Sequence, residues 1–222
     1  MTYLEFVNLL KENAEDDFAR FQRKLIFTKQ TILGVRTPTL RKIAKLFKSD
    51  EKRLLSFPDE YYEVTFIKLT AVSNFPFERF VEELDYCVSL MDNWATCDSF
   101  KAKCIKRNRD AFLPILQDIF NHGGIYYERY PLVVLLNDYV EEKYRGEIKK
   151  FILFADTKEY YIHMAVAWLI AEILIKDYSF GVSLLIERVT DAKTHNKAIQ
   201  KAVESYRLDK KTKEYLRSLK IK

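Results

Sequence analysis

Two side chains that could do chemistry together lie in the segment 91–100, which reads Met-Asp-Asn-Trp-Ala-Thr-Cys-Asp-Ser-Phe. In a helix, Trp94 and Asp98 fall one turn apart on the same face. An indole and a carboxylate in this arrangement can frame a small cationic target. The segment also fits an ordinary helix start, with Asp92 or Asn93 near the positive end of the helix dipole. Taken alone, such a segment is more often an ordinary helix start than a functional site. Other features of the chain must therefore decide whether Trp94 and Asp98 form a site.

A turn and a helix start upstream carry the first group of basic residues. The sequence Leu33-Gly34-Val35-Arg36-Thr37-Pro38 predicts a turn at the glycine and a helix over 37–47, with Thr37 as its cap and Pro38 in the first helical position. The amides at this helix start, together with Arg36 and Arg41, could bind a phosphate. Basic residues on a solvated helix face are the more common case.

Two further groups of cations could extend such a contact. The first directly follows the Trp94 and Asp98 pair, on a helix that we expect to run from Trp94 to about Arg107, and it contains Lys101, Lys103, Lys106 and Arg107. The second surrounds a predicted helix start near residue 193 and contains Lys193 and Lys197. Runs of one charge are usually solvated faces, but they also bind the phosphates of nucleic acids without reading sequence.

Two more candidate residues, Arg129 and Trp168, lie in apolar stretches downstream. Arg129 stands near the start of a predicted helix over 126–139. If it is buried it needs a carboxylate or phosphate partner, and if it is solvated it needs none; the sequence leaves both open. Trp168 follows Ala165 and Ala167, whose small side chains would let another backbone approach. A large ring beside them is usually a core residue.

Metal and disulfide chemistry are not indicated by this sequence. The three cysteines, Cys87, Cys97 and Cys104, contain no Cys-x-x-Cys pair, and the three histidines lie far apart without paired-ligand spacing. We interpret the cysteines as reduced, small core residues. We expect no metal and no cofactor.

The composition favours an all-α fold with a sizeable core. Of 222 residues, 48% are hydrophobic, while glycine and proline number only five each. The chain therefore lacks the turn residues that many short strands would need. Apolar spacing predicts helices over 2–10, 14–26, 37–47, from Pro58, from Pro76, and over 94–107, 110–121, 126–139, 144–154, 158–176, 178–189 and 193–206, followed by a basic, solvated or frayed tail from Asp209.

About a dozen helices joined by short turns suggest antiparallel pairs stacked side by side. The spacing of one pair every 35 to 45 residues or so is near the period of HEAT and armadillo repeats. We therefore expect a curved α-solenoid with a concave basic face, formed by a single domain over residues 1–222. The repeats share no obvious sequence identity, so an irregular helical bundle is the alternative.

The charge balance limits the possible partners and location. A formal charge of +5 and a pI near 8.9 give a mild preference for anionic partners. The N-terminus has no basic region followed by an apolar run, and no stretch reaches the length of a membrane span. We expect a monomeric cytoplasmic protein without a membrane partner.

Five short motifs occur in order along most of the chain. They are Gly34-Val35-Arg36-Thr37-Pro38 with Arg41, Asn93 to Asp98, Arg129 before an apolar helix, Tyr160 to Trp168, and Asn196-Lys197-Ala198-Ile199. Together they resemble the AlkD-like DNA alkylation repair proteins, a family of HEAT-like repeat DNA glycosylases and their relatives. The resemblance implies base excision repair, with release of positively charged alkylpurines such as 3-methyladenine and 7-methylguanine from double-stranded DNA, without flipping of the base into a pocket.

The resemblance also assigns roles to individual residues. Trp94 matches the aromatic residue against the lesion nucleotide, Asp98 the catalytic carboxylate, Arg129 the active-site arginine and Trp168 the second aromatic wall. An alkylated purine is already cationic and leaves readily, so no strong general acid is required. A carboxylate at Asp98 could stabilise the oxocarbenium ion and orient the attacking water, and Arg129 could hold a phosphate or fix Asp98.

Three departures from the family pattern keep other functions open. Better-known members carry a second tryptophan before the match of Trp94 and an arginine shortly after the match of Trp168, where this chain has Asn93 and Ala171. A tyrosine expected near the N-terminus is replaced, and Phe21 is the candidate for its position. The alternatives are a DNA-binding relative that recognises branched or distorted DNA with little excision, and a helical scaffold for a protein partner.

Overall fold

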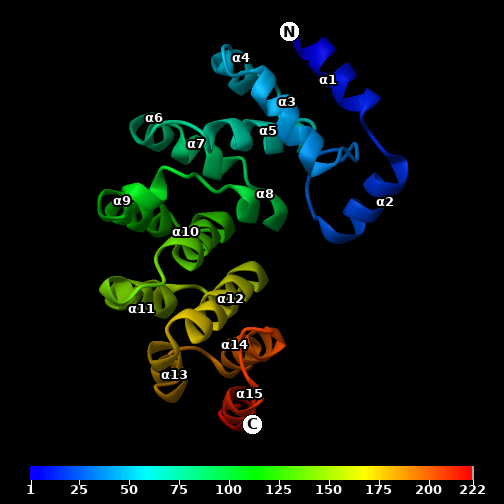
Figure 1. Cartoon of the computed structure of the whole chain (residues 1–222). Helices are drawn as coiled ribbons and strands as arrows, with labels where there is room; N and C mark the ends of the chain where they lie inside the picture. The colour runs from blue at the N-terminus through cyan, green and yellow to red at the C-terminus, as the bar shows by residue number, and fades with distance from the viewer. Residues whose placement is uncertain (222) are drawn as a thin grey trace. The chain divides into compact units, whose positions relative to one another are not determined.

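The computed structural model describes residues 1–221, and in this range the chain folds into fifteen α-helices and two 3-10 helices (Figure 1). These residues form no β-strand; two isolated bridges join Ala14 to Val35 and Thr31 to Tyr61. The prediction of an all-α fold is therefore confirmed. Among the described residues, no helix combines the length and the apolar character needed to cross a membrane.

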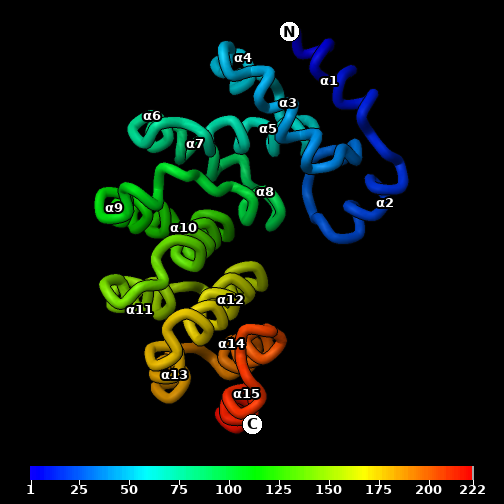
Figure 2. The backbone as a smooth tube through the Cα atoms, viewed as in Figure 1, coloured from blue at the N-terminus to red at the C-terminus, as the bar shows by residue number. Residues whose placement is uncertain are grey.

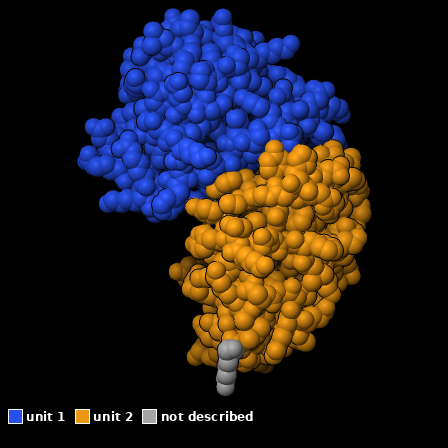
Figure 3. Space-filling view, turned by 180° about the vertical axis from the view of Figure 1, so that it is seen from behind, with its two compact units in different colours: residues 1–108 blue, residues 109–222 orange. Residues whose placement is uncertain are grey.

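The chain divides into two compact units, residues 1–108 and residues 109–222 (Figure 3). The expectation of a single domain over the whole chain stays a prediction.

Unit 1 is built around one buried helix. Its elements are α1 (Tyr3–Glu12), α2 (Asp16–Leu25), α3 (Thr37–Leu46), α4 (Glu51–Leu55), α5 (Tyr62–Val72), α6 (Phe77–Glu82), α7 (Leu84–Ser89), α8 (Trp94–Ser99) and the 3-10 helix η1 (Ile105–Arg107). Helix α5 contacts α3, α4, α7 and α8, and all its residues except Thr70 are buried. Helix α8 therefore rests on the core of this unit.

Unit 2 shows the predicted stacking of helices in pairs. Its elements are α9 (Arg109–Asn121), α10 (Ile125–Asp138), the 3-10 helix η2 (Glu142–Tyr144), α11 (Arg145–Phe154), α12 (Tyr160–Lys176), α13 (Tyr178–Ile186), α14 (Ala192–Glu204) and α15 (Lys210–Ser218). Helix α12 packs against both α10 and α14, and α9 and α13 pack against α10 and α12 respectively (Figures 1 and 2). The long apolar helix α12 is thus the centre of unit 2.

Polar side chains cap several helices and fix where they begin. Thr2 and Glu5 form a reciprocal capping box at the start of α1. Asn93, Asp177, Asp191 and Asp209 accept a backbone hydrogen bond at the starts of α8, α13, α14 and α15. Each cap satisfies an amide that has no partner inside its helix.

The turn before α3 requires a glycine. Gly34 has a φ of 93°, a conformation that side chains disfavour. A Cβ atom at this position would lie 2.5 Å from the carbonyl oxygen of Glu15 and 2.7 Å from the backbone nitrogen of Ala19. The Gly34 turn is therefore fixed both by its backbone angles and by its close contact with the start of α2.

Several predicted helix boundaries are wrong. The helix expected over 94–107 ends at Ser99, because Phe100 and Ala102 are both buried, and a two-residue spacing of buried side chains suits an extended segment rather than a helix. Pro58 does not open a helix: α5 begins at Tyr62, since Thr31 bonds to the extended backbone at Glu60 and Tyr62.

Two further predictions at helix ends are also corrected. Thr37 is the first residue of α3 rather than its cap, and its side chain makes no capping hydrogen bond; Arg36 occupies the cap position. The tail after Asp209 is not frayed. It forms α15, because Asp209 caps the helix and Leu216 is fully buried, and Asn196 holds the following backbone through two hydrogen bonds to Ile221.

Candidate functional site

Helix α8 presents Trp94 and Asp98 in unit 1, as the spacing predicted. Asn93 caps this helix by accepting a hydrogen bond from the Thr96 amide at 3.0 Å, and the Thr96 hydroxyl donates to the Asn93 carbonyl at 3.0 Å. Trp94 is 36% exposed, and Asp98 is partly exposed. The candidate indole and carboxylate therefore stand on a capped helix, and both reach the surface of the unit.

The indole of Trp94 is held in place by the last residue of α2. Its Nε1 donates to the backbone carbonyl of Leu25 at 2.9 Å. This bond uses the polar edge of the ring, and the exposed part of the indole remains available for a contact. Trp94 is therefore not a simple core residue: it is anchored at one edge and exposed elsewhere.

Asp92 attaches the loop that follows α2 to the start of α8. Its Oδ2 accepts from the Thr28 hydroxyl at 2.7 Å and from the Lys29 amide at 2.9 Å. Its Oδ1 accepts from the side-chain amide of Asn93 at 2.8 Å. The sequence suggested only a helix-start role for Asp92, and nothing in its local spacing indicated a partner more than sixty residues away.

The predicted phosphate-binding cations of unit 1 lie at its surface. Arg36, Arg41, Lys101, Lys103, Lys106 and Arg107 are exposed, and Thr37 is partly exposed. Arg36 is engaged with two groups: its guanidinium bonds to both carboxylate oxygens of Glu15, and it lies 4.1 Å from the centre of the Phe18 ring. The side-chain bond to Glu15 raises the pKa of Arg36. This pairing offsets part of the positive charge next to the α3 start.

A buried carboxylate that the sequence did not single out shapes the turn before α3. Glu63 is fully buried in α5. Its Oε1 accepts from the backbone amides of Leu33 at 3.1 Å, Gly34 at 2.8 Å and Val35 at 3.4 Å. A carboxylate bound to several amides is a strong anchor. Glu63 therefore sets the backbone that leads to Arg36.

In unit 2, the Arg129 side chain is buried. The sequence had left open whether this residue is buried or solvated. Its side chain is in α10 and the residue is 5% exposed. The Nη1 atom donates to the backbone carbonyl of Tyr161, in the first turn of α12, at 2.5 Å. The guanidinium therefore joins α10 to α12 through a charge-assisted hydrogen bond to the backbone.

Trp168 is partly buried on α12 and borders a hollow of about 170 Å³. Arg207 also lines it and binds both carboxylate oxygens of Glu172 at 2.9 and 2.6 Å. Ala171, at the position where the resemblance implies an arginine, is buried and also borders this hollow. Two cations therefore line the Trp168 hollow, Lys201 from α14 and Arg207 from the segment after it.

The second predicted cation group, Lys193 and Lys197, lies at the start of α14. Lys193 is exposed and Lys197 is partly exposed. Below them, the buried imidazole of His163 shares a 2.8 Å hydrogen bond with the Thr194 hydroxyl. Burial lowers the pKa of His163, and the positive charge of Lys193 lowers it further. His163 therefore links α12 to α14 as a neutral ring at pH 7.

Asp191 supports this helix start and gives a pH-dependent prediction. Burial alone would raise its pKa, but bonds from Thr194 and Thr157 outweigh burial and lower the pKa to about 2. A carboxylate with a lowered pKa stabilises the fold above about pH 4 and loses that contribution as the pH falls towards 2. We expect Asp191→Ala to lower the free energy of unfolding by about 1 kcal/mol at pH 7.

Urea unfolding at several pH values measures this effect. The difference between Asp191→Ala and the wild type should be full at pH 7 and shrink between pH 4 and pH 2. Asp118→Ala, which removes an exposed aspartate from the middle of α9, serves as the control and should show neither effect. A pH-independent difference for Asp191→Ala would contradict the prediction.

The cysteines behave as the sequence predicted at two of three positions. All three are free; Cys87 and Cys97 are buried, and Cys104 is partly buried. Burial raises the pKa of the Cys87 and Cys104 thiols. Within residues 1–221, no group of three or more His, Cys, Asp or Glu side chains has an arrangement that could hold a metal ion.

The four predicted catalytic residues come from both units. Trp94 and Asp98 belong to unit 1, and Arg129 and Trp168 belong to unit 2. Their grouping into one site stays a prediction.

Comparison with known families identifies the chain. The model of a family described as DNA alkylation repair enzyme matches residues 6–206, which include every helix from α2 to α14 and all the candidate site residues. No curated protein gives a significant match to the chain. The family match covers most of the sequence and makes DNA the expected partner. The chain therefore belongs to the family of DNA alkylation repair enzymes.

Proposed function

We propose that this protein is a monofunctional DNA glycosylase that removes cationic alkylpurines, of the 3-methyladenine and 7-methylguanine type, from duplex DNA. The observation that carries the proposal is the anchored pair on α8, with Trp94 fixed through Leu25 and the Asp98 carboxylate one turn later. The family match supports DNA alkylation repair, and these side chains suit hydrolysis of an N-glycosidic bond.

Asp98 supplies the electrostatic part of the reaction. When the bond between C1′ and the purine nitrogen breaks, its electron pair leaves with the base and positive charge develops on the deoxyribose. A carboxylate stabilises that charge and accepts a hydrogen bond from the attacking water, which adds to C1′ and loses a proton. The alkylated base is already cationic and becomes neutral on leaving, so the mechanism needs no strong acid.

Trp94 contributes to binding of the cation. The exposed part of its indole offers an electron-rich face to an alkylpurine or to the developing sugar cation. The bond from Nε1 to the Leu25 carbonyl holds the ring before DNA arrives, which reduces the entropy lost on binding. We propose that Trp168 provides a second aromatic surface for the DNA.

Arg129 is best explained as a positioning residue. Its 5% exposure leaves little surface for a ligand, and its bond to the Tyr161 carbonyl fixes the first turn of α12. Helix α12 carries Trp168. Loss of the guanidinium would therefore act on the site through the backbone of α12.

A base-release assay tests the proposed reaction. Methylated duplex DNA is incubated with the full chain, and the free bases are separated and quantified. We expect 3-methyladenine and 7-methylguanine to be released, leaving abasic sites without strand cleavage. Absence of release at a protein concentration that saturates the DNA would exclude a glycosylase for these lesions.

A second candidate function is recognition of branched or distorted DNA with little excision. Two positions favour it: Asn93 is fully buried as the α8 cap, and Ala171 is buried on α12. Neither offers DNA the tryptophan or arginine that the family pattern implies there. Tight binding to a DNA junction, without base release from methylated DNA, would support this function.

Binding through phosphates predicts a strong dependence on salt. The logarithm of the association constant should fall linearly with the logarithm of salt concentration, with a slope set by the number of phosphates contacted. We expect the double variant Lys101→Gln, Lys103→Gln to reduce the magnitude of this slope by about two, because each lost phosphate contact changes it by about one. The test is fluorescence anisotropy of a labelled duplex over a salt series.

A matched pair of lysines provides the control for this measurement. Lys210 and Lys211 are exposed on α15, outside every predicted DNA contact. Their double replacement by glutamine removes the same charge and should leave the slope within error of the wild type. Equal changes in both double variants would show that net charge, and not the predicted surface, controls binding.

A further inference from the structure

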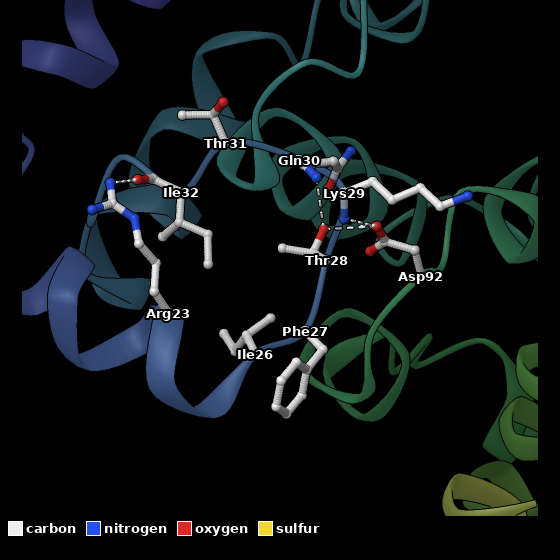
Figure 4. Close-up of a pocket in the computed structure, with 9 residues that line it drawn as sticks. All are labelled: Arg23, Ile26, Phe27, Thr28, Lys29, Gln30, Thr31, Ile32 and Asp92. Carbon is white, nitrogen blue, oxygen red and sulfur yellow. Dashed lines mark hydrogen bonds between the residues drawn. The ribbon is translucent and has the colours of Figure 1, made fainter.

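The loop over residues 26–32, between α2 and α3, is fixed by bonds to three other parts of unit 1. Asp92 accepts from Thr28 and Lys29 at the α8 end. Gln30 donates to the carbonyl of Asp59 at 2.9 Å and to the Thr65 hydroxyl at 2.6 Å. Figure 4 shows the loop curving around an open space, with side chains from both of its ends directed towards it.

Additional bonds close both ends of this loop. The Arg23 guanidinium donates to the carbonyl of Ile32 at 2.7 Å (Figure 4). Trp94 donates to the carbonyl of Leu25 at 2.9 Å. Thr31 forms a backbone bridge to Tyr61. So many bonds over a short segment hold its backbone in one conformation, unlike a typical mobile loop.

This fixed loop places a large apolar ring in solvent. Phe27 is 71% exposed, while its neighbours in the loop, Ile26 and Ile32, are buried. Exposure of an aromatic ring loses the free energy that burial would provide. Phe27 also lies two residues after Leu25, the residue that anchors Trp94. The loop therefore holds the exposed Phe27 two residues from the anchor of the predicted DNA-contacting indole.

The space beside Phe27 is large enough for a flat organic group. The hollow that Phe27, Ile26 and Ile32 help to line has a volume of about 720 Å³, within the range of roughly 300–1,000 Å³ that small-molecule sites occupy. Arg23 and Lys29 also line it, together with the Asp92 carboxylate, which already accepts three hydrogen bonds. An apolar wall with the Arg23 guanidinium at its edge (Figure 4) fits a nucleobase and its phosphate.

The positive charge around the loop favours a nucleic acid as the partner over a protein or an apolar molecule. Between Phe18 and Val35 the sequence contains the cations Arg20, Arg23, Lys24 and Lys29 and no aspartate or glutamate. Arg23, Lys24 and Lys29 are exposed. Exposed aromatic rings among cations are the usual surface for bases that have lost their stacking partners.

We propose that Phe27 stacks on an unpaired base of the bound DNA and that the loop hollow receives the nucleotide, so that unit 1 selects duplexes distorted at a single position. This inference rests on the DNA binding that the proposed function requires, but it is independent of base excision. Phe27 would then decide which DNA is bound rather than how the glycosidic bond is broken.

The test compares two labelled duplexes that differ by one unpaired nucleotide. Affinities are measured by fluorescence anisotropy for the fully paired duplex and for the duplex with a single-base bulge. We expect the wild type to bind the bulged duplex more tightly and Phe27→Ala to lower that affinity about tenfold, the loss typical of one base–aromatic stack. Binding of the paired duplex should change less than twofold.

Matched variants separate stacking from a general loss of apolar surface. Phe154, at the end of α11 in unit 2, is 76% exposed, so Phe154→Ala removes the same ring at similar exposure and should leave both affinities unchanged. Phe27→Tyr keeps the ring and should keep the preference. Thermal unfolding followed by circular dichroism shows whether each variant retains the wild-type fold.

Each result bears on the proposal in a definite direction. The proposal is overturned if the wild type shows no preference for the bulged duplex. It is also overturned if Phe27→Ala lowers the affinity for both duplexes equally, or lowers neither affinity. Base release without a preference for the bulged duplex would contradict the proposed role of Phe27 and still support the glycosylase function. If the wild type prefers the bulged duplex, Phe27→Ala loses that preference and the wild type releases no base, the role of Phe27 is supported and the glycosylase function is excluded.

Discussion

Replacement of Asp98 by asparagine is expected to lower the single-turnover rate of base release by about 100- to 1,000-fold, the loss typical of removing one preorganised electrostatic group. The amide keeps the size and hydrogen-bonding shape of the side chain but lacks the charge that stabilises the oxocarbenium ion. It is also a weaker acceptor for the attacking water. The measurement is the rate of 7-methylguanine release from methylated duplex DNA under excess protein.

Two controls distinguish a chemical role of Asp98 from a structural one. Asp98 is partly exposed on α8, so Asp98→Asn should unfold in urea at the same midpoint as the wild type and bind the duplex with at most a small change in affinity. Asp118→Asn, at an exposed position on α9, should release bases at the wild-type rate. Full activity of Asp98→Asn would rule out the assigned mechanism.

Replacement of Glu63 by alanine is expected to give the largest loss of stability, roughly 3–5 kcal/mol. The change leaves the amides of Leu33, Gly34 and Val35 without their carboxylate acceptor, and it opens a cavity where the side chain is fully buried. Urea unfolding followed by circular dichroism measures the loss.

The loss of hydrogen bonds in Glu63→Ala can also be measured locally, at the turn before α3. Hydrogen exchange of the amides of residues 33–35 should become much faster in Glu63→Ala, because these amides depend directly on the carboxylate. Glu82→Ala, which removes an exposed glutamate from α6, should change the unfolding free energy by about 0.5 kcal/mol or less. Similar losses in the two variants would mean that the Glu63 network contributes little.

Periodicity located most helices but not all of their ends. Helix α10 was expected over 126–139 and spans Ile125–Asp138, and α12 was expected over 158–176 and spans Tyr160–Lys176. Both are long and apolar, so their helical character is fixed by many local bonds and by burial on nearly every side. Helix α4, with only five residues, is too short to give a periodic signal.

Charge patterns showed where the cations lie but not what they bind. Arg36 and the run over 101–107 are at the surface, as expected. The pairing of Arg36 with Glu15 and the stacking of its guanidinium on Phe18 join residues about twenty positions apart. Such pairs depend on how α2 packs near the turn before α3, which no short motif encodes.

The sequence by itself determined the all-α class, the spacing of Trp94 and Asp98 on one helix, and the family to which the chain belongs. These follow from local periodicity, from side-chain spacing within one turn, and from motifs in order. Only the tertiary structure decided that α8 stops at Ser99, that Trp94 is anchored on Leu25, that Glu63 holds the turn before α3, and that Arg129 is buried. The physical reason is that burial and hydrogen bonding between distant segments depend on packing, which brings together residues that have no relation in sequence.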